Sequence, residues 1–132
     1  MKKKLFLLFA AVLMVAFTAS AYFNLNASFS GKVGTYPVTG SFELGTTGEI
    51  YGQYGYVKNG RKPKAMLDLE GQWDSPSETK YRLKIIESSN GKVTGTWNVV
   101  YDSAKRTITG TMTTNGKTYK VNLTTSKASI MN

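Results

Sequence analysis

One five-residue pattern recurs six times in this chain: apolar, polar, glycine, polar, apolar. Its copies begin at Phe29, Val38, Ile50, Leu69, Val93 and Ile108. Two further segments, which begin at Tyr81 and Tyr119, keep the alternation but place an aliphatic residue where the glycine stood. Alternation of apolar and polar residues is typical of a β-strand with one buried face. The sequence therefore predicts eight strands of one kind.

The glycines of this pattern lie on the same strand face as the apolar residues two positions away, because side chains alternate along a strand. A glycine within a strand lowers stability by roughly 0.5–1 kcal/mol relative to alanine, so six of them need a reason. Two interpretations are open. Either each glycine permits a sharp bend or a close backbone approach, or the missing side chains leave an internal cavity.

The strands are predicted over residues 23–33, 36–44, 49–57, 64–73, 79–87, 92–101, 106–114 and 117–124. Their connections are short, and Asn59-Gly60 and Asn115-Gly116 favour tight hairpin turns. No segment after residue 21 has helical periodicity, so the sheet must cover its own apolar face. We therefore predict an all-β fold, an eight-stranded antiparallel up-and-down meander barrel, with a two-sheet β-sandwich as the alternative.

The first 21 residues have the pattern of a secretory signal peptide. Three lysines precede an apolar run from Leu5 to Phe17, and Ala19-Ser20-Ala21 matches a cleavage site. The run is short for a membrane-spanning helix, which needs about 20 apolar residues, although an uncleaved anchor is the alternative. We expect a bacterial protein that is periplasmic or extracellular. Its single barrel domain would span residues 22–125, followed by a frayed tail over residues 126–132.

Composition limits the chemistry of this chain. It has no cysteine and no histidine, which excludes a thiol nucleophile, a Ser-His-Asp triad and a Cys/His zinc site. Asp68 and Glu70 share a strand face, but it is the outer face, where no pair of carboxylates is expected to flank a substrate. We therefore expect a protein that is not an enzyme and that has no cofactor and no metal.

The net charge bears on partners. The chain carries 17 Lys and Arg against 8 Asp and Glu, a formal net charge of +9 at pH 7. This excess favours acidic partners or serves solubility alone. We expect no nucleic-acid partner, and we expect contact with a membrane only through the signal peptide before its cleavage.

Two Gly/Thr-rich hairpins resemble those of small secreted β-barrel proteins of gut Bacteroidetes: Gly31-Lys-Val-Gly-Thr-Tyr-Pro-Val38 and Gly91-Lys-Val-Thr-Gly-Thr-Trp97. The meander over residues 27–123 also resembles avidin-like and lipocalin-like barrels. The resemblance implies a closed barrel. It implies no ligand, because no biotin-binding set can be placed on this chain and no lipocalin Gly-x-Trp stands near residue 22.

Aromatic side chains expected on the inward face are the first candidates for a functional site. Tyrosine and tryptophan combine an apolar body with a polar tip, which suits a ligand pocket. The candidate lining residues are Tyr54, Tyr56, Trp73, Tyr81, Trp97, Tyr101 and Tyr119. Alternatively, these rings only fill the core. No charged residue is expected deep inside, so an internal ligand would be apolar or aromatic.

A basic hairpin is the second candidate. It contains Lys58, Arg61, Lys62 and Lys64, and we expect Tyr51 beside it on the outward face. Cations beside aromatic rings bind anionic glycans or phosphates. Lys80, Arg82 and Lys84 would lie close by if the fifth strand pairs with the fourth.

Two functions therefore stay open. The first is binding of a small apolar or aromatic ligand inside the barrel or at its mouth. The second is a surface interaction in which the basic hairpin binds an acidic glycan, an envelope component or a partner protein.

Overall fold

The computed structural model describes residues 24–131, so the expected signal peptide at residues 1–21 lies outside the described residues. The described chain forms nine strands. They are β1 (Asn24–Val33), β2 (Tyr36–Gly45), β3 (Glu49–Tyr56), β4 (Leu67–Asp74), β5 (Lys80–Ser89), β6 (Lys92–Asp102), β7 (Thr107–Thr114), β8 (Lys117–Thr125) and β9 (Ser129–Met131). In this part of the chain no helix is long and apolar enough to cross a membrane.

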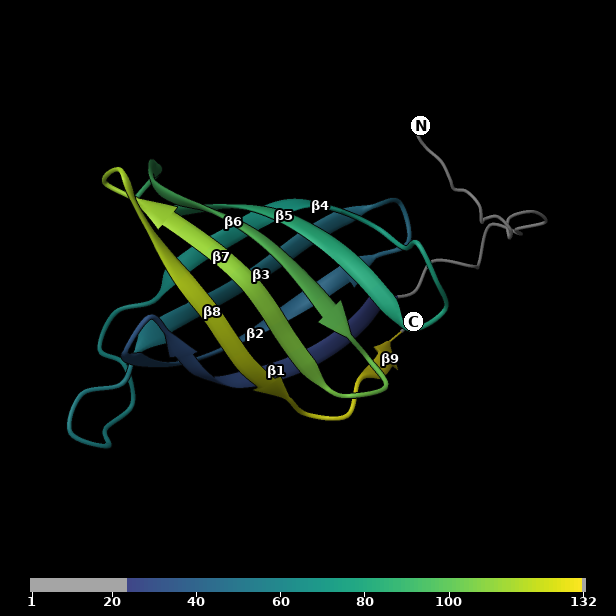
Figure 1. Cartoon of the computed structure of the whole chain (residues 1–132), viewed down its shortest axis with the longest axis horizontal. Coiled ribbons are helices and arrows are strands. Elements are labelled where there is room, and N and C mark those ends of the chain that lie inside the picture. Colours follow the sequence, from purple (N-terminus) through teal and green to yellow (C-terminus); the bar gives the residue numbers. More distant parts are fainter. Residues whose placement is uncertain (1–23, 132) are drawn as a thin grey trace.

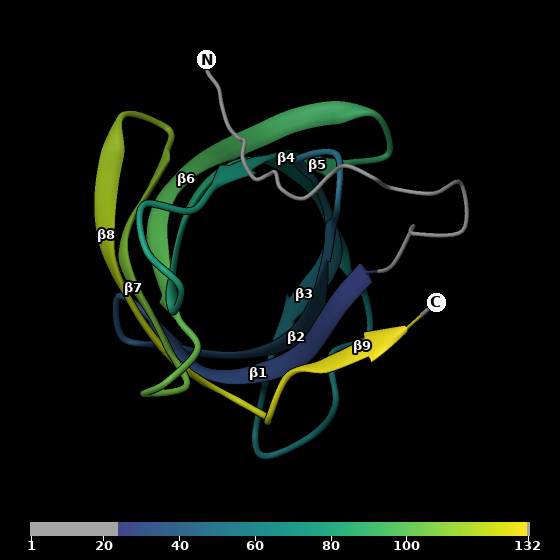
Figure 2. The same cartoon turned by 90° about the vertical axis from the view of Figure 1, so that its right-hand side faces the viewer.

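Strands β1 to β8 form a closed antiparallel barrel in which sequence neighbours are also neighbours in space (Figure 1). The ring closes at β1, which pairs with β2 along its whole length and with β8 over residues 29–33. A view along the axis shows the continuous ring of strands (Figure 2). The predicted up-and-down meander barrel is confirmed, and closure excludes the two-sheet sandwich. The architecture is consistent with lipocalin-like and avidin-like barrels.

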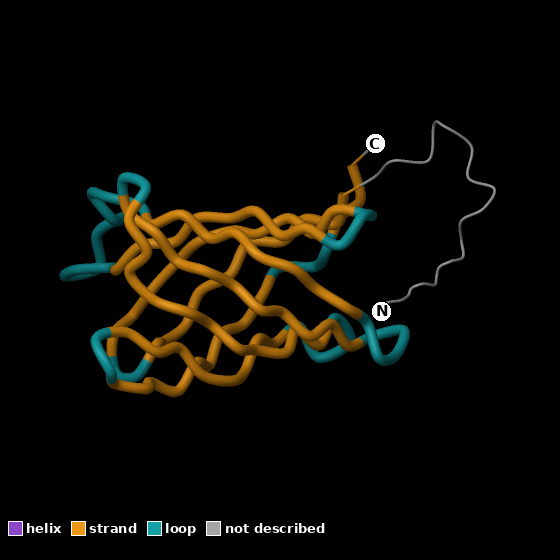
Figure 3. The backbone as a smooth tube through the Cα atoms, turned by 90° about the horizontal axis from the view of Figure 1, so that it is seen from above, coloured by secondary structure: helices purple, strands orange, loops and turns teal. Residues whose placement is uncertain are grey.

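The connections gather at two opposite ends of the barrel (Figure 3). The β1–β2, β3–β4, β5–β6 and β7–β8 connections share one end, which we call the long-loop end because it holds residues 57–66. The other end carries Asn24 and Met131, and we call it the termini end. At the long-loop end, Asn90 and Asn115 have φ of 52° and 50° and each precedes a glycine of positive φ, as tight hairpin turns require.

The inward face of the sheet is packed with apolar and aromatic side chains. Tyr54 and Tyr101 are 0 % exposed, and Trp97 is 3 % exposed. The Tyr54 and Trp97 rings meet edge to face with centroids 5.0 Å apart, as do the rings of Phe42 and Tyr101. These rings fill the interior of the barrel.

The glycines of the repeat are explained by close approach of neighbouring backbones. A Cβ placed on Gly71 would lie 1.9 Å from the carbonyl oxygen of Lys84 on the adjacent strand. At Gly110 it would lie 2.3 Å from the carbonyl oxygen of Asn98, and the φ of +149° there also disfavours a side chain. At these two positions the structure supports the geometric interpretation and not the cavity.

A β-bulge interrupts the pairing of β5 with β6. Glu87 lies opposite Gly95, but Ser88 lies opposite Val93, which leaves Thr94 as an extra residue. One extra residue reverses the alternation beyond it. Val93 therefore points outward and is 67 % exposed, whereas the repeat predicted it on the inward face.

Two predicted segments differ from the structure. The strand expected over residues 64–73 begins only at Leu67 and ends at Asp74, after a longer loop. The tail expected to be frayed contains β9, whose residues pair antiparallel with Asn24–Asn26 of β1. Strand β9 covers the part of β1 that β8 does not reach, which supplies backbone partners there.

Candidate ligand-binding site

A cleft of about 350 Å³ opens at the long-loop end of the barrel. It is lined by Val33, Tyr36, Pro37, Tyr56, Val57, Lys58, Met112, Thr114 and Tyr119. Apart from Lys58 and Thr114, these side chains are apolar or aromatic. Small-molecule sites typically have volumes of about 300–1,000 Å³ and mainly apolar walls, so the cleft has the size and chemistry of a site for a small ligand.

The turn between β1 and β2 positions two sides of the cleft. Gly34 has φ of +63°, and a Cβ on it would lie 2.9 Å from Cδ1 of Tyr119. Its backbone N–H donates a 2.7 Å hydrogen bond to the carbonyl of Lys120. The glycine therefore lets the Tyr119 ring pack over the turn, and the next strand starts with Tyr36, whose ring contacts that of Tyr119.

Three tyrosine rings frame the opening. Tyr36 contacts Tyr56 with ring centroids 6.1 Å apart at 87°, and it contacts Tyr119 at 6.5 Å and 68°. Both are edge-to-face arrangements, which aromatic rings favour. Tyr36 is 55 % exposed, so its ring can cover a bound molecule without first leaving the core.

The base of this frame is a chain of hydroxyl groups that ends on a buried carboxylate. The Oη atoms of Tyr56 and Tyr54 are 3.3 Å apart, and the Tyr54 hydroxyl donates to Oε1 of Glu87. An ionised carboxylate only accepts hydrogen bonds. The Tyr54 proton is therefore directed to Glu87 and the Tyr56 proton to Tyr54, which leaves the oxygen of Tyr56 as an acceptor.

Glu87 corrects the expectation that no charged residue lies deep inside. It is 4 % exposed, and its carboxylate also accepts hydrogen bonds from Trp97 Nε1 at 3.0 Å and from Thr94 Oγ1 at 2.7 Å. A buried charge is strongly unfavourable unless hydrogen bonds compensate it. Here three donors do so, and the β-bulge supplies one of them by turning Thr94 toward Glu87.

The environment of Tyr54 keeps its hydroxyl protonated. Burial raises the pKa of Tyr54 far above its ordinary value, and the hydrogen bond to Glu87 raises that pKa further. Ionisation would place a second negative charge beside the carboxylate. Tyr54 therefore remains a hydrogen-bond donor at every physiological pH.

The seven aromatic residues predicted as ligand lining fall into separate groups. Tyr56 and Tyr119 line the cleft, and Tyr54 and Trp97 lie beneath it around Glu87. The other three, Trp73, Tyr81 and Tyr101, pack together elsewhere, with centroid distances of 5.5 Å between Trp73 and Tyr81 and between Tyr81 and Tyr101. Trp73 Nε1 donates to the carbonyl of Gly45, next to the β2–β3 turn at the termini end.

Several lining residues were not among the candidates. Tyr36, Val33 and Met112 alternate in phase with their buried neighbours, so the sequence places them on the inner face. What it does not show is that barrel closure brings these strand ends together around one opening. Glu87 continues the inward series of Tyr81, Leu83 and Ile85 by two residues, so the alternation itself indicated a buried carboxylate.

The basic hairpin lies in the β3–β4 connection, which projects beyond the rim of the barrel (Figure 1). Its cations Lys58, Arg61, Lys62 and Lys64 are exposed, and no ion pair within residues 24–131 involves them. The expectation that Lys80, Arg82 and Lys84 lie close by is wrong. Because β4 and β5 are antiparallel, these residues lie toward the termini end, where Arg82 forms an ion pair with Asp74.

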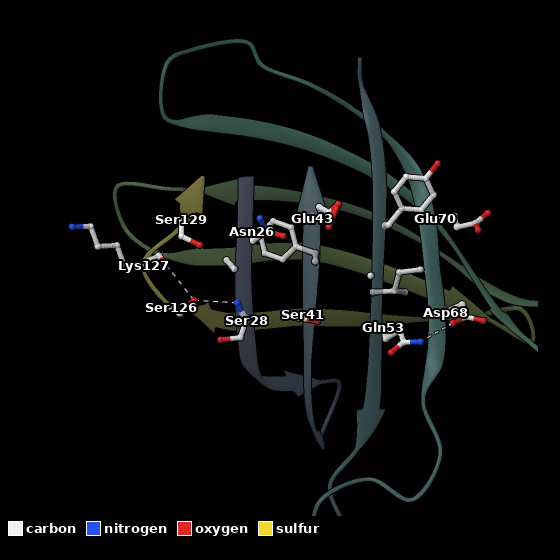
Figure 4. A pocket seen from close by; sticks show the side chains of 15 residues that line it. Asn26, Ser28, Ser41, Glu43, Gln53, Asp68, Glu70, Ser126, Lys127 and Ser129 are labelled. Atoms are coloured by element: carbon white, nitrogen blue, oxygen red, sulfur yellow. Dashed lines mark hydrogen bonds between the residues drawn. The ribbon is translucent and has the colours of Figure 1, made fainter. Parts of the chain in front are cut away.

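A second, polar cleft of about 510 Å³ lies on the outer face of β1 to β4 (Figure 4). Tyr51 belongs to it, with Glu43 and Glu70 directly opposite on the two neighbouring strands. Tyr51 thus lies among carboxylates and not beside the basic hairpin as expected. Gln53 Nε2 donates to Asp68 Oδ1 at 3.3 Å. Within residues 24–131 no cluster of potential metal ligands occurs, here or elsewhere.

Comparisons with protein-family models, with curated proteins and with solved structures found no match for this chain.

Proposed function

We propose that this protein is a non-enzymatic binding protein that holds a small apolar or aromatic molecule at the mouth of its barrel. The observation that carries this proposal is the cleft at the long-loop end, where Tyr36, Tyr56 and Tyr119 frame an opening of about 350 Å³. Aromatic rings give a large contact area and lose little conformational freedom on binding. The cleft therefore suits a flat or compact apolar ligand.

The packing of the interior favours the mouth over the centre of the barrel. Tyr54, Trp97 and Tyr101 are buried against one another or against Phe42. A ligand in the centre would have to displace these rings, and displacing Tyr54 or Trp97 would also remove hydrogen bonds from Glu87. A ligand in the cleft displaces only solvent.

The walls of the cleft are held in place before any ligand arrives. The Val57 N–H donates to the carbonyl of Pro37 at 2.9 Å, which fixes the start of the long loop against β2. Tyr56 is fixed by its contacts with Tyr54 and Tyr36. Such preorganisation lowers the entropic cost of binding, which supports a site that serves binding.

The proposed cellular location is supported by patterns in the sequence. The signal-peptide pattern of residues 1–21 supports a periplasmic or extracellular protein. The two Gly/Thr-rich hairpins support a small secreted barrel of the kind that gut Bacteroidetes produce. A carrier or scavenger of small molecules would fit that location.

The test is binding of N-phenyl-1-naphthylamine, a neutral apolar dye that fluoresces when it leaves water. Protein purified from cells that express the full chain should bind it saturably. Tyr36→Ala should weaken binding about 5- to 30-fold, the usual effect of losing one central aromatic contact. Tyr51→Ala is the matched control, because Tyr51 is 53 % exposed but lies on the outer face, and this variant should bind like the native protein.

The proposal fails if the native protein shows no saturable binding. It also fails if Tyr36→Ala and Tyr51→Ala have equal effects, because the dye would then bind elsewhere. Thermal unfolding of both variants checks that they are folded.

A second candidate function follows from the four exposed cations of the β3–β4 connection. Since they have no ion-pair partner within residues 24–131, they are available to an acidic glycan, an envelope component or an acidic protein. Retention on immobilised heparin, an anionic polysaccharide, should then fall with salt. Replacing Lys58, Arg61, Lys62 and Lys64 by Gln should abolish it. If retention changes neither with salt nor with these substitutions, this candidate function is excluded.

A further inference from the structure

The connections at the long-loop end of the barrel are cationic. At the long-loop end the four connections, residues 34–35, 57–66, 90–91 and 115–116, contain four cations and no carboxylate. Lys92 and Lys117, which begin β6 and β8, add two more cations at the same end. A cluster of one sign around a low-dielectric opening concentrates ligands of the opposite sign. The mouth of the barrel therefore attracts anions.

One of these cations belongs to the cleft itself. Lys58 lines the opening, and the backbone around it is well fixed. Val57 is bonded to Pro37, and the Arg61 N–H donates to the Lys58 carbonyl at 2.9 Å. Asn59 and Gly60 between them have φ of 53° and 70°, as in a tight two-residue turn.

The rest of the loop folds back on β3. A Cβ on Gly55 would lie 2.5 Å from Cβ of Pro63 and 2.7 Å from the carbonyl oxygen of Ala65. The glycine thus allows the loop to lie directly on the strand. This contact holds the cationic loop at the rim, beside the aromatic frame.

The buried carboxylate of Glu87, which lies near the cleft, does not repel an anion at the rim strongly enough to prevent its binding. Glu87 is covered by Tyr54 and accepts three hydrogen bonds, whose donor dipoles offset its charge. Lys58, by contrast, is exposed and has no ion-pair partner within residues 24–131.

We infer that the natural ligand is an amphipathic anion. Its aromatic or aliphatic body would lie in the cleft against the rings of Tyr36, Tyr56 and Tyr119, and its carboxylate or sulfonate would lie at the rim against Lys58. This inference rests on the proposed function and narrows it, because it assigns a charge to the ligand and a role to the basic loop.

A matched pair of dyes tests this. 8-Anilinonaphthalene-1-sulfonate is N-phenyl-1-naphthylamine with one added sulfonate, so the difference between their affinities reports the contribution of the negative charge. The native protein should bind the sulfonate about three- to tenfold more tightly than the neutral dye at low salt, and this preference should shrink as salt screens the charges. Lys58→Gln should remove most of the preference, because it lowers the affinity for the sulfonate more than the affinity for the neutral dye. Lys105→Gln, at the termini end, is the control and should change neither affinity.

The outcomes separate the two proposals. If both dyes bind equally well, or if the sulfonate preference survives in Lys58→Gln and in the variant with all four loop cations replaced, the anionic ligand is excluded and the apolar site stands. If neither dye binds, the proposed function itself is wrong and the inference falls with it.

Discussion

The side chains of Tyr54 and Glu87 are joined by a hydrogen bond that links β3 to β5 through the interior of the barrel. Strand β4 lies between these two strands in the sheet, so this bond is independent of the backbone ladder. It places a buried anion directly below the aromatic frame of the cleft.

Replacing Glu87 by Gln tests the importance of this anion. The amide has nearly the same shape, but with its NH₂ group toward Thr94 its neutral oxygen accepts from Tyr54 and Trp97 more weakly than a carboxylate does. Replacing such charge-assisted hydrogen bonds by neutral ones costs about 1–3 kcal/mol. We expect the free energy of unfolding, measured with denaturant, to fall by about this amount. Glu70→Gln, on the outer face of β4, should change it by less than about 0.5 kcal/mol. Equal effects of the two substitutions would contradict the assigned role.

Stability should fall at alkaline pH because of buried phenols. Burial raises the pKa of Tyr54, Tyr81 and Tyr101 in the folded protein, whereas an unfolded tyrosine ionises near a pKa of about 10. The unfolded state therefore releases these protons first as pH rises. The stability from the three groups is complete below about pH 10 and is lost progressively above it.

Denaturant unfolding between about pH 8 and pH 11 measures this loss. Tyr54→Phe should be less stable than the native protein at neutral pH, since its bond to Glu87 is gone, but its stability should depend less steeply on pH. If the stability of the native protein stays constant above pH 10, these phenols ionise as readily in the folded state as in the unfolded state, which would contradict the prediction.

The glycines should differ in their tolerance of a methyl group. A Cβ on Gly71 would lie 1.9 Å from a backbone oxygen, against 2.9 Å for Gly95. Overpacking of this kind typically costs about 1–3 kcal/mol. Gly71→Ala should therefore lose at least this much stability, and Gly95→Ala clearly less. Equal losses would mean that the neighbouring strands can move apart at both positions.

The β-bulge predicts that position 93 tolerates a charged side chain, whereas the repeat alone would place that position in the core. Val93 is 67 % exposed, so Val93→Lys should change stability by less than about 0.5 kcal/mol. Val99 lies on the same strand but is 2 % exposed, and Val99→Lys should prevent folding because it buries an unpaired charge. Circular dichroism shows whether each variant is folded, and thermal unfolding measures its stability. An unfolded Val93→Lys protein would contradict the outward position of Val93 at the bulge.

Local patterns were sufficient to predict most of the fold. Alternation located the strands, the Asn-Gly pairs located the turns, and the absence of a helix required the sheet to close. The bulge at Thr94 could not be predicted, because the residues around it keep the apolar–polar alternation of the repeat. Nothing in the segment marks one residue as extra. Strand β9 could not be predicted either, since its three residues gain their partner only where β8 ends.

The candidate site was harder to predict because it depends on closure. The sequence placed Tyr54, Trp97 and Glu87 in phase with buried residues, but only the closed barrel brings β3, β5 and β6 to one point. Likewise, Tyr36 and Tyr119 are far apart in sequence and become neighbours because β8 pairs with β1. The role of Lys58 depends on how the long loop folds back, which no periodic pattern encodes.

The pairing of Asn24 with Met131 has a practical consequence for orientation. Both residues lie at the end of the barrel opposite the cleft. A protein attached to a surface, a bead or a neighbouring domain through a linker joined at either residue would present its tyrosine frame and basic loop to the surrounding solution.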